Sequence, residues 1–478
     1  MTKTSRIILA NVVAGLVFGG GFISWRSYAA RQAWQAMRPP MPVVSSTGAP
    51  GLQARLTACS QRLQSNSPDR AALAEFALLC HANGFVTEAA TAYRGLIQLD
   101  PNEARWPHLL ATILAGYGEL GEALPLLQRA TQLAPDHIPS RLRLGDVLLK
   151  TNNAAGAEAA YQEVLHREPE NPYALLGLAR CDLQAERWTA ARAHLQQAVK
   201  GAPNFSAAQH LLATVQERLG NPAAAAAALS HAAQGAKRFG DAPDGWIDEL
   251  VPYCHDVYQL LVTASAAASS GSPRQAMPAL ERAVTLAPDD ARVRRQFGNT
   301  LDALGDLNGA REQLTRAIAL SPGSDYLYLD LIPVLHEAHD EAAVDGVITN
   351  GLAACPTSAG LHFEAGMVAV RREQWDVAIP HLEITWKSRP DEVAAPAELA
   401  KAHFRQGHSE AGVAVLEQFL ADQPRDLTAL LMLVRYGIGS GDARTAVWLE
   451  RAAAAGGPSA TLTELRQAYH RRFGAITP

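Results

Sequence analysis

The sequence predicts an all-α fold, a solenoid of repeated helix pairs, and three features indicate it. Prolines recur at intervals of 34 residues along most of the chain. Between them, apolar residues follow the period of an amphipathic helix, and small residues return at fixed places in each interval. Aromatic residues make up only 6% of the chain and alanine is abundant, which suits closely packed helices better than strands.

The prolines form two series that share the same interval. A proline lacks the amide hydrogen and clashes with the preceding turn, so each one ends a helix and marks the start of the next repeat. The first series is Pro101, Pro135, Pro169 and Pro203, and the second is Pro288, Pro322, Pro356, Pro390, Pro424 and Pro458. The two series are 85 residues apart, which is two intervals and 17 further residues.

Each interval holds two helices with complementary apolar stripes. In residues 70–103, Leu73, Phe76 and Cys80 share a stripe of the first helix, and Tyr93 and Leu96 share a stripe of the second. Small residues at the eighth and twentieth places let the helices approach closely, and a large residue at the twenty-fourth place fills the space between neighbours. Residues 138–171 and 291–324 repeat this arrangement.

This pattern resembles the tetratricopeptide repeat family. The resemblance covers residues 70–460 apart from an insertion, with units that begin at Arg70, Ala104, Ile138, Pro172, Ser206, Val257, Ala291, Asp325, Ala359, Val393 and Leu427. It implies a right-handed α-solenoid of about eleven helix-turn-helix units, interrupted by 17 residues, with a concave groove lined by the first helices. It also implies binding of a protein or peptide in that groove, without fixing the partner.

The predicted organisation has seven parts. They are a membrane anchor or signal segment (1–26), a juxtamembrane and proline-rich linker (27–51), an N-terminal capping helix (52–69), a first block of five repeats (70–239), the insertion or joint (240–256), a second block of six repeats (257–460) and a C-terminal capping helix (461–478).

The N-terminal segment has two interpretations. Lys3 and Arg6 precede an uncharged run from Ile7 to Trp25, which is long enough to cross a bilayer as a single helix. As a retained anchor it predicts a single-pass membrane protein with its repeats on the periplasmic or extracytoplasmic side. As a signal peptide cleaved after the small residue Ala29, it predicts a secreted protein.

Composition and motifs exclude several function classes. A net charge of -5 gives no basic surface for nucleic acid, so no nucleic-acid partner is expected. The five cysteines are far apart and the histidines are scattered, so no metal site and no cofactor are predicted. No nucleophile, phosphate-loop or paired-carboxylate motif is present, and the chain is therefore not expected to be an enzyme.

A cluster of polar residues is one candidate for a peptide site. Arg292, Arg295 and Asn299 are spaced three and four apart, so they share one face of a first helix. Arg295 and Asn299 stand at places where the family holds a peptide carboxylate, although the adjacent repeats lack the complementary cations. The alternative is an ordinary solvated charged face.

Aromatic residues on the expected groove side are a second set of candidates. Aromatic side chains anchor apolar or extended peptides, but at helical spacing they also fill cores, so both readings stay open. The set comprises Tyr173, Tyr258, Tyr326, Phe363 and Phe404.

The insertion, Gly240 to Asp256, adds half a repeat. Asp244 can cap a short helix over the following residues, and Pro252 would end it. We expect a joint between the two blocks, with Trp246 buried and Asp248 and Glu249 solvated. The alternative is a flap that lays Trp246, Asp248 and Glu249 against the groove.

Together these features predict a membrane-tethered scaffold that binds a protein or peptide partner, in envelope assembly or protein maturation. A cytoplasm-facing regulator of assembly is the alternative, and an enzyme with an unrecognised site is a third reading.

Overall fold

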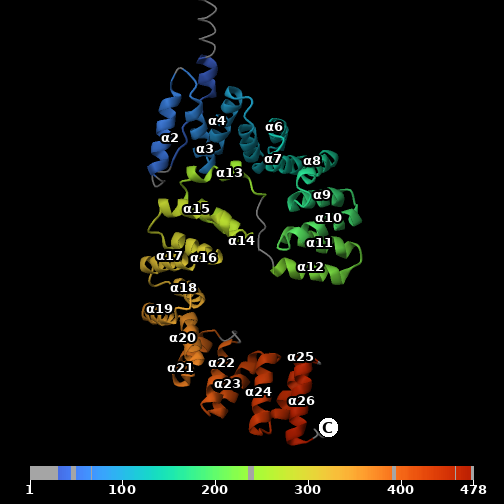
Figure 1. Ribbon diagram of the computed structural model, residues 1–478, viewed down its shortest axis with the longest axis vertical. Coiled ribbons are helices and arrows are strands. Elements are labelled where there is room, and N and C mark those ends of the chain that lie inside the picture. The colour runs from blue at the N-terminus through green and yellow to red at the C-terminus, as the bar shows by residue number, and fades with distance from the viewer. Residues whose placement is uncertain are drawn as a thin grey trace, which may run out of the picture. The chain divides into compact units, whose positions relative to one another are not determined.

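The computed structural model describes residues 31–44, 50–65, 67–234, 242–389, 394–457 and 459–474 (Figure 1). Within these ranges the secondary structure is α-helical with one short 3-10 turn and no strand, so the predicted all-α fold is confirmed. The chain divides into two compact units, residues 1–288 and 289–478.

The first unit contains a helical stretch at residues 31–37 and the helices α2 to α15. These are α2 (Pro50–Leu63), α3 (Arg70–Ala82), α4 (Val86–Leu99), α5 (Arg105–Gly116), α6 (Leu120–Leu133), α7 (Ile138–Lys150), α8 (Ala154–Arg167), α9 (Pro172–Gln184), α10 (Trp188–Gly201), α11 (Ser206–Arg218), α12 (Pro222–Gln234), α13 (Gly245–Asp248), the 3-10 turn η1 (Val251–Tyr253), α14 (Val257–Ser269) and α15 (Pro273–Leu286).

The second unit contains α16 to α26. These are α16 (Ala291–Ala303), α17 (Leu307–Leu320), α18 (Asp325–Glu337), α19 (Glu341–Ala354), α20 (Ala359–Arg371), α21 (Trp375–Ser388), α22 (Ala394–Arg405), α23 (Ser409–Asp422), α24 (Leu427–Ser440), α25 (Thr445–Gly456) and α26 (Ala460–Phe473).

Helices pack mainly against their neighbours in sequence, as a solenoid requires. The first helices of adjacent pairs also touch, for example α5 with α7 and α7 with α9 in the first unit, and α18 with α20 in the second. We call the surface formed by the first helices α3, α5, α7, α9 and α11 the inner face of the first unit.

The predicted small and large places meet in three dimensions. Gly145, Gly298 and Gly366 stand at the eighth places of their repeats, and each lies against the residue at the twenty-fourth place. A Cβ atom on Gly145 would lie 2.6 Å from the Tyr161 ring, and Cβ atoms on Gly298 and Gly366 would lie 2.7 and 2.8 Å from Leu314 and Leu382. The small residue at the eighth place of these repeats therefore marks a position where the second helix of the pair leaves no room for a side chain.

The turn between the two helices of each pair contains one residue in the left-handed conformation, with a positive φ. The position of this residue also recurs every 34 residues. Glycine occupies most of these places, including Gly84, Gly118 and Gly220 in the first unit. The exceptions are Asn152, Glu186, His339 and Glu373, with φ between 56° and 60°. A residue with a Cβ atom is strained in this conformation, so these turns store unfavourable energy.

Replacing Glu186 by glycine is expected to raise the free energy of unfolding by about 0.5–1 kcal/mol. The left-handed conformation costs a non-glycine residue about 1–2 kcal/mol, and the greater freedom of glycine in the unfolded chain offsets part of that gain. Urea unfolding followed by circular dichroism measures the change. Glu186→Ala keeps the strain and serves as the control, so equal midpoints for the two variants would contradict the explanation.

Part of the predicted N-terminal linker belongs to the folded body. The linker was expected over residues 27–51, but residues 31–37 are helical and Trp34 is only 1% exposed. The Trp34 indole Nε1 donates to the Ser65 carbonyl at 3.0 Å, and Arg38 donates to the same carbonyl at 2.6 Å. The indole ring is buried against the core of α2 to α4, so this part of the predicted linker is folded and is not only a spacer.

The predicted anchor, residues 7–25, lies outside the described residues. No helix within the described ranges is both long enough and apolar enough to cross a membrane.

The division between the two units differs from the expected one. The sequence places it at the insertion, 240–256, whereas the structure places it after Pro288, so α14 and α15 belong to the first unit. The 3-10 turn η1 packs against both α3 and α15. Arg282 of α15 also donates through Nε to the Cys254 carbonyl at 3.1 Å. These contacts hold the end of the insertion and the following helix pair to the start of the first solenoid.

Candidate peptide-binding site

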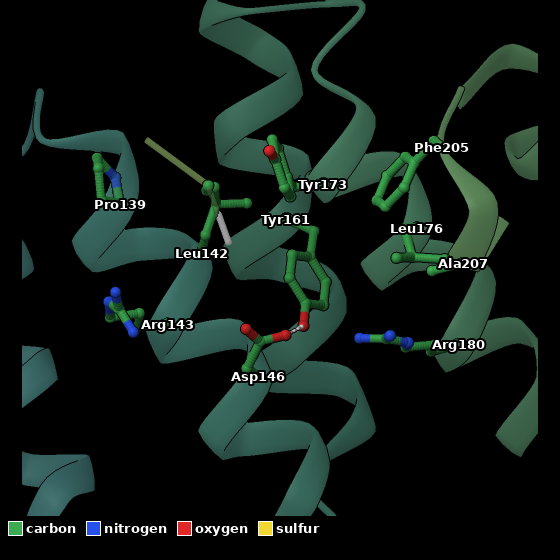
Figure 2. A pocket seen from close by; sticks show the side chains of 11 residues that line it. Pro139, Leu142, Arg143, Asp146, Tyr161, Tyr173, Leu176, Arg180, Phe205 and Ala207 are labelled. Carbon is green, nitrogen blue, oxygen red and sulfur yellow. Dashed lines mark hydrogen bonds between the residues drawn. The ribbon is translucent and has the colours of Figure 1, made fainter. Parts of the chain in front are cut away.

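A cavity of about 180 Å³ opens on the inner face between α7, α9 and α11 (Figure 2). Its wall repeats the same places in successive repeats, namely the second, fifth and ninth residues of the first helix. The lining residues are Pro139, Leu142, Arg143, Asp146, Tyr161, Tyr173, Leu176, Arg180, Phe205, Ala207 and Ala242. Of the residues predicted from the sequence, only Tyr173 lies here.

Aromatic and aliphatic side chains form one wall of this cavity. The rings of Tyr173 and Phe205 lie 5.5 Å apart between centroids, and Leu142 and Leu176 line the same cavity (Figure 2). Phe205 immediately precedes α11 and is buried, so this wall is fixed in place by the core beneath it. An apolar side chain of a ligand would be sheltered from water here.

Charged groups form the floor. The Tyr161 hydroxyl donates to Asp146 Oδ1 at 2.7 Å (Figure 2). Burial and the neighbouring Asp146 carboxylate raise the pKa of Tyr161, so its hydroxyl stays neutral and keeps donating. Arg180 points toward the same cavity from α9 and is exposed. It forms no ion pair with any residue that the structure describes.

A second cavity, of about 430 Å³, continues from the first toward the insertion. The two share Pro139, Leu142, Tyr173 and Ala242. His137 and Trp246 also line the second cavity. The open part of the inner face therefore ends where the insertion begins.

The insertion is held to the inner face by a buried carboxylate. Asp244 is 4% exposed and accepts a hydrogen bond from His108 Nε2 at 2.8 Å and one from Arg143 Nε at 3.3 Å. His137 Nε2 lies 3.8 Å from its other oxygen. Despite the burial, the hydrogen bond from His108 and the cations around the carboxyl keep the pKa of Asp244 below its usual value. Asp244 also caps α13 through the Trp246 amide.

The three insertion residues named from the sequence lie beside α5 and α7. The Trp246 ring stacks on His137 with centroids 3.5 Å apart and an angle of 13°, and it is half-buried. Glu249 is exposed and pairs with Arg105 of α5 at 2.6 Å. Asp248 is exposed. Asp244 finds its partners on the inner face, so this part of the insertion lies beside α5 and α7, while its end contacts α3 and α15.

Ser140, His108 and Asp244 form a chain of hydrogen bonds, but the two ring nitrogens are used the opposite way round from the serine, histidine and carboxylate triad of hydrolases. Ser140 Oγ lies 2.7 Å from His108 Nδ1, and His108 Nε2 lies 2.8 Å from Asp244. Both Ser140 and His108 have an exposed fraction of 0%, so no substrate carbonyl can reach the hydroxyl. The alignment holds the insertion in place and does not form a reaction centre. In the described part of the chain, no group of three or more acidic, histidine or cysteine side chains could hold a metal ion.

The predicted polar cluster on α16 is occupied by the protein's own carboxylates. Arg295 Nε donates to Asp330 at 2.5 Å, and Asn299 Nδ2 donates to the same oxygen at 3.0 Å. Arg292 pairs with Asp290 at the start of its own helix. Asp330, on the next first helix, therefore takes the position that a ligand carboxylate would occupy, and the cluster presents no unpaired cation.

The remaining predicted aromatic residues do not gather at one place. Tyr258 on α14 is 71% exposed, and Tyr326 lies under the Arg295 guanidinium at 4.6 Å. Phe363 is half-buried against the core of the second unit. Phe404 stacks on Tyr436 with centroids 4.4 Å apart and also packs against Gly412, so it fills the core.

The sequence reasoning missed His108, Arg143, Arg180 and Phe205. Three of these could have been found by asking which polar or aromatic residues recur at the helix places that face inward. Arg180 stands at the ninth place of its repeat and His108 at the fifth. Phe205 directly precedes the first helix of its repeat. Arg143 stands at the sixth place of its repeat, and nothing in the sequence pattern indicated that it would face inward.

Comparison with known proteins supports the repeat assignment. Profiles described as "Tetratricopeptide repeat" match residues 114–162, 151–215, 267–343 and 397–460, which together cover about half of the chain. Mouse "Tetratricopeptide repeat protein 34" is 27% identical over 290 residues, 56% of this chain and 46% of that protein. "Cellulose synthase 1 operon protein C" of Komagataeibacter xylinus is 32% identical over 145 residues, 27% of this chain and 11% of that protein. The chain spans less than half the length of either relative.

Two solved structures can be aligned with parts of this chain. The yeast Tom70 crystal structure aligns with 84% of this chain and 96% of its own, at 14% identity and a TM-score of 0.35. A MamA structure from Desulfovibrio magneticus RS-1 aligns with 35% of this chain and 95% of its own, at 20% identity and a TM-score of 0.33.

The profile matches agree with the helix pairs, the 34-residue interval and the paired glycine and large residues described above. Scaffolds of this kind mediate protein–protein interactions on the surface that their stacked helices create. The chain belongs to the tetratricopeptide repeat family.

Proposed function

We propose that this chain is a membrane-tethered scaffold that holds an extended segment of a partner protein on the inner face of its first unit. The observation that carries the proposal is the open cavity between α7, α9 and α11. It combines a fixed aromatic wall with Arg180, which forms no ion pair within the described residues.

The lining predicts the chemistry of the ligand. The rings of Tyr173 and Phe205 would receive an apolar or aromatic side chain. Arg180 would donate to a carboxylate or a main-chain carbonyl of the same segment. Leu142 and Leu176 add aliphatic surface to the cavity, whose volume of about 180 Å³ suits a side chain of an extended segment better than a folded surface.

Site-specific photo-crosslinking tests the proposal in the native membrane. A photoreactive residue in place of Ala207, which lines the cavity, is expected to capture a partner that mass spectrometry identifies. The same residue in place of Gln196, which is exposed on the second helix α10, serves as the control. Equal capture at both positions, or at neither, would argue against binding in this cavity.

Replacing Tyr173 by alanine is expected to weaken binding of the captured partner segment by about tenfold or more. Truncation removes an aromatic anchor at the centre of the cavity, where such residues carry most of the binding free energy. Isothermal titration with the partner peptide measures the change. Lys200→Ala alters an exposed side chain at the end of α10 and should leave affinity and stability unchanged. A loss in the Lys200 variant as large as in the Tyr173 variant would contradict the site.

The proposal of a membrane tether rests on residues 7–25. An apolar segment of this length inserts as a single helix, and basic residues flank it on both sides. The full-length chain is expected to remain in the membrane pellet through a carbonate wash, whereas a chain lacking residues 1–26 should appear in the supernatant. A mature chain that begins near residue 30 and is soluble would support cleavage of a signal peptide instead.

We further propose that the repeats lie on the extracytoplasmic side, where the scaffold would serve envelope assembly or protein maturation. A pair of reporters fused after Pro478, one active only in the cytoplasm and one only outside it, tests this orientation. Activity of the cytoplasmic reporter alone would support the assembly regulator that faces the cytoplasm.

A further inference from the structure

We infer that residues 242–255 act as a built-in ligand of the inner face and occupy a second peptide site on the same chain. This site takes an acidic residue and a tryptophan that are separated by one residue. The inference deepens the proposed function and rests on the inner face being a peptide-binding surface. It adds the class of peptide that the α3 to α7 part of that face recognises, and a means of regulating access to it.

The acidic side chain of this built-in ligand is recognised by several separate groups. His108 on α5 and Arg143 on α7 both donate to Asp244 Oδ2. His137, immediately before α7, approaches the other oxygen. Ser140 Oγ contacts Nδ1 of both histidines at 2.7 Å and so orients the two rings. This is a preformed carboxylate site on the solenoid, and the insertion supplies the carboxylate.

The aromatic side chain has its own receptor. Trp246 lies flat against His137 and edge-on to His108, with a centroid distance of 5.1 Å to the latter. The main chain further along the insertion is also recognised: Asn83 Nδ2 donates to the Tyr253 carbonyl at 2.9 Å, and Asn83 Oδ1 accepts from the His255 amide at 2.8 Å. Paired bonds from one asparagine to a peptide backbone are a means of holding an extended segment regardless of its side chains.

Two of these contacts use the same repeat places as the open cavity. Arg105 and His108 stand at the second and fifth places of their repeat, as Tyr173 and Leu176 do in the repeat that lines the cavity. The insertion thus lies on the α3 to α7 part of the inner face in the way that a bound peptide would. The cavity at α7 to α11 is the part it leaves open, and Ala242 and Trp246 form the border between them.

A covalently attached ligand competes with any partner for the same site. When the attached segment occupies the site more than nine-tenths of the time, a partner in trans binds with an apparent affinity at least about tenfold weaker than the intrinsic one. A partner with a similar acidic and aromatic pair would bind only after the insertion is displaced. The Glu249 to Arg105 ion pair is more exposed than the Asp244 contacts and contributes less to holding the segment.

The test uses the full-length chain and a fluorescent synthetic peptide that copies residues 242–255. In the variant Asp244→Asn with Trp246→Ala, the insertion loses its acidic and aromatic side-chain contacts but keeps those of Glu249, Tyr253 and His255. His108, His137 and Arg143 remain unchanged. We expect the peptide to bind this variant, measured by fluorescence anisotropy, about tenfold or more tightly than it binds the wild-type chain. A peptide with asparagine in place of the aspartate that copies Asp244 should bind the variant more weakly.

The matched control is Asp248→Asn, which changes an exposed carboxylate of the same short helix and should behave as the wild-type chain does. The inference is overturned when the double variant binds the peptide no better than wild type, or when the altered peptide binds as well as the original.

A second measurement needs no variant, and it decides the matter should the double variant fail to fold. Hydrogen exchange of the wild-type chain in excess peptide is expected to rise in residues 242–255 and to stay unchanged in α5 and α7. Unchanged exchange in residues 242–255 at saturating peptide would overturn the inference. Neither measurement involves the partner protein that binds in the open cavity. A failure of crosslinking at Ala207 would therefore count against the proposed function, whereas a failure of this competition would count against the built-in ligand.

Discussion

Replacing Gly177 by valine is expected to destabilise the first unit by about 3 kcal/mol or more. A Cβ atom on Gly177 would lie 2.4 to 2.6 Å from three atoms of the Tyr161 ring, closer than side chains tolerate. The ring has little freedom to retreat, because it also packs closely on the backbone of Gly145 and its hydroxyl is bonded to Asp146. Overpacking of a fixed core position forces backbone shifts that cost about 1–3 kcal/mol, and a branched side chain is at the upper end.

Urea unfolding followed by circular dichroism measures this loss, and hydrogen exchange in α7 to α9 locates it. The matched control is Gly121→Val, because Gly121 is an exposed residue of α6 with nothing within 4 Å of its added Cβ. That variant is expected to shift the free energy of unfolding by no more than about 0.5 kcal/mol. Similar midpoints for the two variants would show that the space around Tyr161 adapts and that the close approach is not specific.

The repeat places explain why so much of the fold could be predicted from the sequence. Gly145 and Tyr161 are only 16 positions apart, and their contact returns in other repeats with different residues, such as Gly298 with Leu314. A contact that is local and repeated leaves a periodic signal. The 34-residue interval is that signal, and it also marks the left-handed turn residues such as Gly84 and Glu186.

The insertion could not be placed in the same way. Its anchoring contact joins Asp244 to His108, residues 136 positions apart, and occurs once in the chain. A contact that occurs once leaves no periodic pattern in the sequence. A histidine at an inward-facing position of one repeat cannot be told from an ordinary polar residue. Its length and its cap at Asp244 could be derived, because both depend on neighbouring residues alone.

The candidate site was predicted only in part for a related reason. Tyr173 was identified by its place in the repeat, but whether an aromatic residue at such a place is open or packed depends on the next repeat. Phe404 is covered by Tyr436, whereas Tyr173 and Phe205 together line one wall of an open cavity. The clamp at Arg295 failed because Asp330, on the following first helix, neutralises it.

Acidification from pH 6.5 to pH 4 is expected to lower the stability of the first unit by several kcal/mol. Burial, together with the charges of Arg143 and His108, lowers the pKa of both His81 and His137 from 6.5 to about 4. The His81 Nδ1 atom also shares a hydrogen bond with the Tyr93 hydroxyl at 3.1 Å.

The sign follows from proton binding. Between pH 4 and pH 6.5 these histidines are protonated in the unfolded chain and neutral in the folded one, so unfolding takes up protons and lower pH favours it. Because each tenfold change in proton affinity corresponds to about 1.4 kcal/mol, the upper bound is about 3 kcal/mol for each ring. The Asp244 carboxylate opposes the shift at His137 but does not reverse it. Asp244 itself, with a lowered pKa, loses its contribution only below this window.

Urea midpoints at a series of pH values measure the effect. The wild-type midpoint should fall steadily from pH 6.5 to pH 4 and be flat above pH 7. In the variant His81→Gln with His137→Gln the same fall should be much shallower, because neither ring is left to take up a proton on unfolding. His166→Gln, which changes an exposed histidine on α8, should retain the wild-type profile. A double variant as sensitive to acid as the wild type would assign the loss to other groups, of which His255, also lowered in pKa by burial, is the first to examine.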